Sequence, residues 1–249
     1  MKYVDINEAI KADGLRIVIV KAMPSAWGVA AKAMIDFKGL DYLCAHQIPM
    51  ADNPELLAWS GTNSGPVVAW NDEEPINRWD DILLLLERLA PEKPLVPENP
   101  ADRIEVFGIS REICGERGFG WNRRVDMMRP AAGEEPGPFA QKYSYRDTEA
   151  VHANARVIAL MAELATRLKA QKAKGSDYLV GQSVTAADFY WAAFCNFVHL
   201  QPVEEMPVNP DARPMFENTP AEIKAAIDPV LTAHRDHMTH TYYELPFGL

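Results

Sequence analysis

The stretch RIVIVKAMPSAWGVAAKAMIDFKG, Arg16–Gly39, decides the fold of the first third of the chain. Its opening run RIVIV is rich in β-branched residues and predicts a buried strand. Apolar residues at helical spacing follow from Trp27 to Lys38, and Gly39 is typical of the residue that ends a helix. The connection contains Pro24, Ser25 and Trp27, where a plain turn would use Gly, Asn or Asp. Ser25 is therefore either a helix cap or a catalytic hydroxyl.

The rest of the chain divides into two parts with different patterns. Further strands are predicted over Asp41–Ile48 and Gly65–Trp70, with a short one around Pro75–Arg78, and a helix over Trp79–Leu89. Residues 90–100 contain four prolines and have the composition of a linker. Beyond them the pattern is helical and contains no convincing strand. We therefore predict an α/β domain in residues 1–89 and an all-helical domain in residues 101–249.

Composition excludes several classes of function. The 249 residues are 48% hydrophobic, which is enough for a folded core. A formal charge of −10 argues against nucleic acid and against anionic membrane surfaces as partners. The longest apolar run, Ile82–Leu86, is far too short to span a membrane. Three cysteines without a Cys-x-x-Cys pair are consistent with a reducing cytoplasm and with buried, unreactive thiols.

Three histidines near the C-terminus raise the question of a metal site. His234, His237 and His240 follow one another at intervals of three residues. This spacing spreads the imidazoles around a helix, and no set of cysteines and carboxylates surrounds them. We therefore expect no metal, and assign this stretch to an ordinary C-terminal helix.

The sharpest local signal is GQSVTAADFYWAAF, residues 181–194. Thr185 and Asp188 form the pattern of a capping box, and Val184 and Phe189 occupy the positions of a hydrophobic staple. By themselves these residues predict only a buried helix with a well-defined start. Behind a βαβ–ββα domain and a linker, however, the motif resembles that of the cytosolic glutathione transferases. The resemblance extends over nearly the whole chain, and it implies a thioredoxin-like domain followed by a helical bundle.

The resemblance implies roles for residues in the first domain. Ser25 occupies the register of the catalytic serine in serine-type members, where the hydroxyl stabilises the glutathione thiolate, and Trp27 would line the sulfur pocket. NSGPVVAW, residues 63–70, resembles the segment in which a cis-proline marks the glutathione site. Pro66 would then be cis, with Ser64 and the Gly65 backbone contacting the peptide. Without the resemblance, Trp27 is a packing residue and Pro66 an ordinary trans proline at the start of a strand.

One position departs from the family pattern. Where members usually have an acid followed by Ser, to hold the γ-glutamyl group, this chain has Arg78 and Trp79. Arginine cannot accept from an ammonium, although it can bind a carboxylate. Asp80 and Asp81 follow directly and could replace the missing charge. The alternative is that Trp79 anchors the core and Arg78 is a surface charge.

The second substrate would meet the helical domain. In the family the electrophile pocket includes the fourth helix, which corresponds here to GERGFGWNRR, residues 115–124. Three glycines in this stretch predict a bend or close packing. Phe119, Trp121 and Arg124 are the candidates for contact with the electrophile, and Arg124 would suit an anionic one.

The leading hypothesis is therefore a cytosolic, homodimeric, serine-type glutathione transferase with glutathione as co-substrate and no metal. It would conjugate glutathione to a small electrophile, or use glutathione to isomerise the electrophile, dehalogenate it or cleave its ether bond. A non-catalytic binding or interaction protein of the same fold is the alternative, suggested by the altered residues at 78 and 79. A thiol–disulfide reductase is disfavoured, since the Cys-x-x-Cys pair is missing.

Overall fold

The computed structural model describes residues 2–249 and divides the chain into two compact units. The sheet unit contains the chain up to Leu95 together with Pro202–Asn209 and Thr239–Leu249. The helical unit contains Val96–Gln201 and Pro210–Met238. Two segments from the last fifth of the sequence therefore pack with the N-terminal part of the chain.

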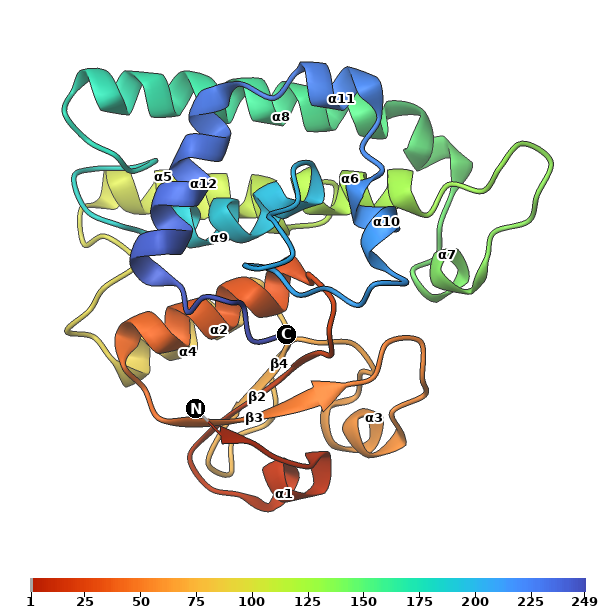
Figure 1. The fold of residues 1–249 in the computed structure, drawn as a ribbon. Coiled ribbons are helices and arrows are strands. Elements are labelled where there is room, and N and C mark those ends of the chain that lie inside the picture. Colours follow the sequence, from red (N-terminus) through yellow and green to blue (C-terminus); the bar gives the residue numbers. More distant parts are fainter. Residues whose placement is uncertain (1) are drawn as a thin grey trace. The chain divides into compact units, whose positions relative to one another are not determined.

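The sheet unit is built on four strands in the order β1-β3-β2-β4 (Figure 1). They are β1 (Lys2–Tyr3), β2 (Leu15–Val20), β3 (Tyr42–Gln47) and β4 (Val67–Trp70). Strands β1, β3 and β2 run parallel to one another, and β4 runs antiparallel to β2. A small mixed sheet with helices is the predicted architecture, and the prediction is confirmed.

Helices cover both faces of this sheet. They are α1 (Ile6–Lys11), α2 (Ala26–Lys38), α3 (Pro54–Ser60) and α4 (Trp79–Leu89). Helices α2 and α4 pack against each other on one face, and α1 and α3 lie together on the other (Figure 1). Helix α2 ends at Gly39, whose φ of 71° lies in the left-handed region that glycine adopts easily.

Three parts of the sheet unit differ from the sequence prediction. The strand expected around Pro75–Arg78 is wrong, because only Ile76 makes a bridge, to Val68. The residues on either side of Ile76 are in neither a strand nor a helix, so the pairing does not extend. The two-residue strand β1 and the short helices α1 and α3 were not predicted, since segments of this length carry too few residues for a periodic signal.

The helical unit contains no strand within the residues that the structure describes. Its elements are α5 (Pro100–Cys114), α6 (Phe119–Met127), α7 (Pro138–Lys142), α8 (Asp147–Ala173), α9 (Ala186–Phe194), the 3-10 turn η1 (Cys195–Phe197), α10 (Arg213–Glu217), α11 (Ala221–Ala225) and α12 (Pro229–Tyr242), whose last turn clusters with the sheet unit. Helix α6 packs against α8, and α5 packs against α9.

The predicted bend in the glycine-rich stretch is confirmed as a break between α5 and α6. A Cβ at Gly118 would come within 2.4 Å of the backbone oxygen of Glu112, so this turn is too tight for any larger residue. Arg117 in the same turn has a φ of 61°.

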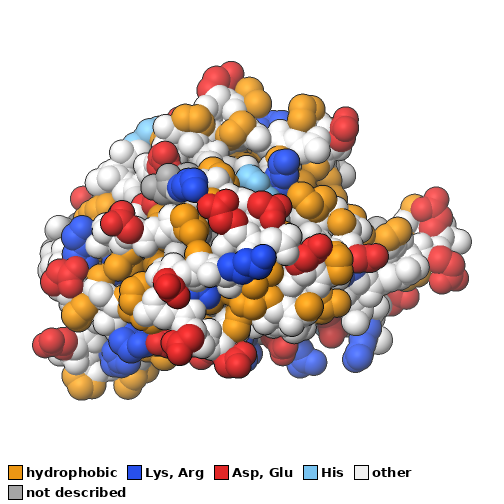
Figure 2. All heavy atoms as spheres, turned by 90° about the horizontal axis from the view of Figure 1, so that it is seen from below, with side chains coloured by type: hydrophobic (Ala, Val, Ile, Leu, Met, Phe, Trp, Pro, Cys, Tyr) orange, Lys and Arg blue, Asp and Glu red, His pale blue; other side chains and the backbone are white. Residues whose placement is uncertain are grey.

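The surface carries charges of both signs. Figure 2 shows acidic and basic side chains interspersed with apolar ones on the face it presents. None of the helices within residues 2–249 has the length and apolar character needed to cross a membrane.

Candidate functional site

The residues predicted for the site come from three segments near the carboxyl end of strand β2. Strand β2 leads into the loop that carries Ser25. In the antiparallel register of β2 and β4, Val18 lies opposite Val67, and Gly65 comes close to the backbone of Val18 and Ile19. The bridge between Val68 and Ile76 turns the chain back. Arg78 follows two residues after this bridge, directly before α4.

Ser25 is the residue before α2 and is half-buried. Its backbone N–H donates to the carbonyl of Met23 at 2.8 Å, and its own carbonyl accepts from Val29 at 3.0 Å. Its side chain makes no capping hydrogen bond to the helix. A serine that serves as an N-cap would use its hydroxyl oxygen for this bond. The geometry thus argues against the plain capping role and leaves the hydroxyl available to a ligand.

The start of α2 adds a favourable field. The helix has 13 residues and no acidic residue in its first turn, so its positive N-terminal end is not neutralised by its own side chains. Gly28 lies against Ile19 of β2, where a Cβ would approach the isoleucine side chain to 3.3 Å. This first turn is thereby packed closely on the strand that leads to it. Trp27, in the same turn, is half-buried.

The second segment is the loop before β4. The peptide bond between Gly65 and Pro66 is cis, as predicted. A Cβ on Gly65 would meet the backbone oxygen of Val18 at 3.1 Å, so the loop approaches β2 more closely than a side chain would allow. Ser64 is half-buried, and its N–H donates to Oγ1 of Thr62 at 3.2 Å.

The third segment is the start of α4, where the chain departs from the family pattern. The Arg78 side chain is 69% exposed, and its Nη2 lies 2.8 Å from Oδ2 of Asp80. Its Nε lies 3.4 Å from Oδ2 of Asp81. Trp79 follows as a half-buried residue. Arg78 is thus already balanced by two carboxylates, which the sequence alone did not show.

Asp80 has a further feature that sequence reasoning missed. Its Oδ1 is buried and has no hydrogen-bond partner among the described residues. Leaving a buried acceptor unsatisfied costs about 1–3 kcal/mol. The other oxygen of the same carboxylate is bound to Arg78. One side of Asp80 is therefore ready to accept from a donor such as an ammonium group.

The candidates for the electrophile pocket lie in the helical unit. Phe119 is fully buried, and its ring stands edge-on to Trp191 with 5.2 Å between centroids. The ring thus packs in the core of this unit, and a contact between Phe119 and the electrophile stays a prediction. Trp121 donates from Nε1 to Glu149 at 3.3 Å. The Arg124 guanidinium lies over the ring of Tyr143, 4.4 Å from its centroid, and burial lowers its pKa.

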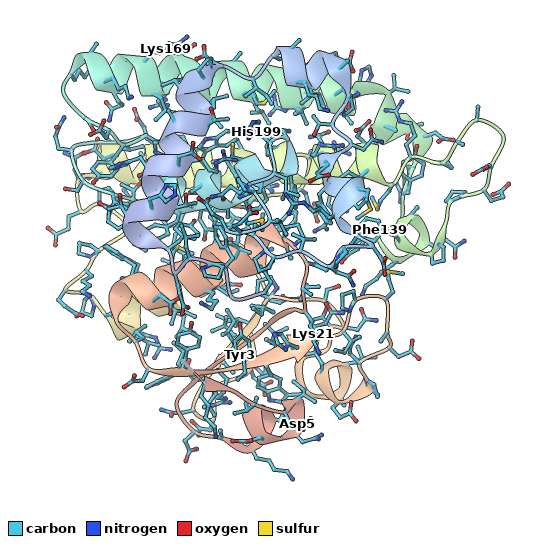
Figure 3. The ribbon with its side chains drawn as sticks, in the orientation of Figure 1. Tyr3, Asp5, Lys21, Phe139, Lys169 and His199 are labelled. Carbon is cyan, nitrogen blue, oxygen red and sulfur yellow. The ribbon has the colours of Figure 1, made fainter. Side chains whose placement is uncertain are left out.

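Trp121 and Arg124 adjoin an aromatic cluster. Trp121, Phe139, Tyr143 and Tyr145 pack around buried apolar residues of α6, α7 and α8. Phe139 is labelled in Figure 3. The Arg124 guanidinium over the Tyr143 ring is a cation–π contact at the edge of this cluster. A role for either residue in substrate contact stays a prediction.

The capping-box motif has a structural role in the helical unit. Asp188 is fully buried, and its Oδ2 accepts from the N–H of Thr185 at 2.8 Å and from its hydroxyl at 2.9 Å. Its Oδ1 accepts from the N–H of Leu179 at 2.7 Å and lies 3.0 Å from Nε2 of His234. The capping box is confirmed, and the same carboxylate also joins the preceding loop and α12 to α9.

The three histidines of α12 do not converge. His234 is buried beside Asp188, whereas His237 and His240 are exposed. Within residues 2–249, no group of three or more His, Cys, Asp or Glu side chains lies close enough to hold a metal ion. Cys44, Cys114 and Cys195 are free and buried, as predicted.

Comparison with known proteins gives structural matches only. No protein-family model matches the sequence, and no curated protein is similar enough to match it. A glutathione S-transferase from Methylobacterium radiotolerans, solved with glutathione sulfonate, has a TM-score of 0.62 at 16% identity over 91% of both chains. A sphingomonad glutathione S-transferase complexed with glutathione has a TM-score of 0.55 at 17% identity, over 89% of this chain and 98% of that one.

A third match is the beta-etherase LigF from Sphingobium sp. strain SYK-6. Its TM-score is 0.58 at 17% identity, over 90% of this chain and 99% of that one. All three proteins are covered over almost their whole length, so both units of the chain are included in the likeness. At such identities a match establishes architecture, and the chain has the fold of the glutathione S-transferases.

Proposed function

We propose that the chain is a glutathione transferase in which the Ser25 hydroxyl stabilises the thiolate of bound glutathione. The observation that carries the proposal is the position of this hydroxyl. It lies at the start of α2, makes no capping bond, and follows strand β2, which pairs with the strand directly after Gly65–Pro66. A hydroxyl and a helix N-terminus that face a sulfur atom both favour its anionic form.

The chemistry needs a thiolate at neutral pH. A free thiol of this kind has a pKa of about 8.5, so only a small fraction is ionised at pH 7. A hydrogen bond from Ser25 would lower this pKa. The sulfur then attacks an electrophilic carbon, a carbon–sulfur bond forms, and the leaving group departs with its electron pair. Conjugation, dehalogenation and ether cleavage, the reaction for which LigF is named, share this first step.

The alternative is a protein of the same fold that binds a ligand without catalysis. The Arg78–Asp80 ion pair favours this alternative, because it occupies the place where the family usually holds the γ-glutamyl group. Thiol–disulfide reduction has less support. The chain has no Cys-x-x-Cys pair, and its three cysteines are buried.

Retention on immobilised glutathione and conjugation to an aryl halide test the proposal. Ser25→Ala should retain the fold and glutathione affinity but lose about 2–4 kcal/mol of transition-state stabilisation, or roughly 30- to 1000-fold in kcat/KM. Ser183→Ala, at an exposed serine outside the site, is the matched control. Unchanged turnover of Ser25→Ala would assign the stabilisation of the thiolate to another group, such as Trp27 or a backbone N–H.

The proposal includes a homodimer and a cytoplasmic location, both of which stay predictions. Light scattering after size-exclusion chromatography should give twice the mass of 27.8 kDa for the dimer. A monomeric mass at micromolar concentration would contradict this part of the proposal without affecting the role of Ser25.

A further inference from the structure

A segment far from Ser25 in sequence is bonded to the loop that carries it. The N–H of Asn209 donates to the carbonyl of Ala22 at 2.9 Å. Ala22 has a φ of 52°, in the left-handed region that alanine rarely adopts. This residue lies three positions before Ser25, directly after Lys21, which is labelled in Figure 3. The loop thus contains an unfavourable backbone conformation whose carbonyl is held by a partner from outside the loop.

The segment that supplies this bond, Pro202–Asn209, is itself anchored. Met206 and Val208 are only 1% and 3% exposed. The Glu205 carbonyl accepts from the N–H of Phe247 at 2.8 Å, and its carboxylate lies 3.1 Å from Nε2 of His240. Two independent contacts therefore join this segment to Thr239–Leu249, which is the other late segment of the sheet unit.

The C-terminal segment is fixed in turn to α2. The Nζ of Lys32 lies 3.0 Å from Oε2 of Glu244 and 3.1 Å from Oδ2 of Asp36. The Lys32 side chain is only 7% exposed, and its pKa is raised by these two acids against the opposing effect of burial. A buried cation shared between α2 and the tail makes this junction specific. Bonded contacts thus run from α2 through Glu244, Phe247 and Asn209 to the loop before Ser25.

We propose that Pro202–Asn209 is a positioning segment of the Ser25 site. The inference rests on the proposed function of Ser25, since it assigns the segment the task of aiming that hydroxyl. Asn209 acts through the Ala22 carbonyl and touches no reacting atom. Loss of its N–H leaves the left-handed turn without this support, and Ser25 then samples directions in which its hydroxyl misses the sulfur.

Two variants at one position test the assignment. Asn209→Pro removes the N–H, whereas Asn209→Ala keeps it and removes only the side chain. Amide hydrogen exchange over residues 21–26 should become roughly 2- to 10-fold faster in Asn209→Pro, as expected for one hydrogen bond. The pKa in the pH profile of kcat/KM should rise by about 0.3–1 unit, while Asn209→Ala, which keeps the N–H, should change both measurements less than Asn209→Pro. A merely structural role would not move this pKa.

Several outcomes would overturn the proposal. One is wild-type exchange at residues 21–26 in folded Asn209→Pro, and another is an equal effect of the two variants. The Asn209 amide of the wild type must also exchange slowly, so a rapidly exchanging amide refutes the bond even if Asn209→Pro does not fold. Glu244→Gln gives a second route, because release of the tail from Lys32 should speed exchange at Asn209 and Ser25. The exchange measurements remain decisive even if the wild type has no activity with glutathione.

Discussion

Substitution of Asp80 by Asn tests how this site holds an amine. Oδ1 of Asp80 is buried without a partner, while Oδ2 is bound to an exposed arginine. If the γ-glutamyl ammonium donates to Oδ1 of Asp80, it forms a charge-assisted hydrogen bond at a partly buried site. Such bonds contribute about 1.5–3 kcal/mol. Asp80→Asn should therefore raise the Kd for glutathione roughly 10- to 150-fold.

Asp81→Asn is the matched control, because it removes the same charge one residue away. The Asp81 side chain is 50% exposed, and it lies 3.4 Å from Nε of Arg78. Exposed pairs of this kind contribute under about 1 kcal/mol. We expect Asp81→Asn to change the Kd by less than roughly fivefold. Titration calorimetry measures both variants, and circular dichroism melting confirms that the free proteins remain folded.

Two results would refute this reasoning. One is an Asp80→Asn variant that binds glutathione as tightly as the wild type, which would leave the buried oxygen without a role in binding. Equal losses in both variants would assign the effect to general electrostatics rather than to one contact. The absence of binding by the wild type would favour the non-catalytic alternative. Arg78→Ala and Arg78→Lys extend the series: if Arg78 clamps the carboxylate, Lys should restore only part of the loss, since it lacks the planar fork.

Three further predictions follow from the packing. Gly65→Ala should cost about 1–3 kcal/mol of stability and weaken glutathione binding, since its Cβ would lie 3.1 Å from a β2 carbonyl; an unchanged melting temperature would contradict this. Thr185→Ala should lower the free energy of urea unfolding by about 0.5–2 kcal/mol. Asp188→Ala should lower it by about 3–5 kcal/mol, because several buried donors lose their acceptor; equal losses in the two variants would refute this difference. Burial raises the pKa of the Cys44 and Cys195 thiols to about 12, so a thiol reagent at pH 8 should label them only after denaturation, and rapid labelling of the native protein would contradict their burial.

The strand, turn and helix around Ser25 could be predicted from the sequence because their signals are local. A β-branched run and a helical repeat each depend on neighbours within a few residues. The capping box at Thr185 is equally local. The cis bond before Pro66 was predicted from the family resemblance, since the sequence around a proline at the start of a strand does not indicate its isomer.

Other features depend on contacts that no local pattern records. The pairing of Arg78 with two carboxylates requires side-chain positions at the start of α4. For Asp188 the sequence predicted only the capping box, because Leu179 and His234, which its carboxylate also contacts, belong to other parts of the chain. The bond from Asn209 to Ala22 joins residues about three quarters of the chain length apart. Hydrophobic periodicity reports on one element at a time, so it could not bring these residues together.

The sheet register explains why the fold alone leaves the activity open. Because β2 and β4 pair in antiparallel fashion, the loop after β2 with Ser25 and the loop before β4 with Gly65–Pro66 lie at the same end of the two strands, whichever side chains they carry. A structure with about 16% identity to this chain can therefore share the arrangement. The chemistry depends on a few side chains on that frame, and fold similarity does not determine them. In the function we propose, Ser25 supplies the chemistry of a thiolate site, and Arg78 and Asp80 would change how the peptide is recognised. A chain that binds glutathione through Asp80 and activates it through Ser25 would reconcile the two observations.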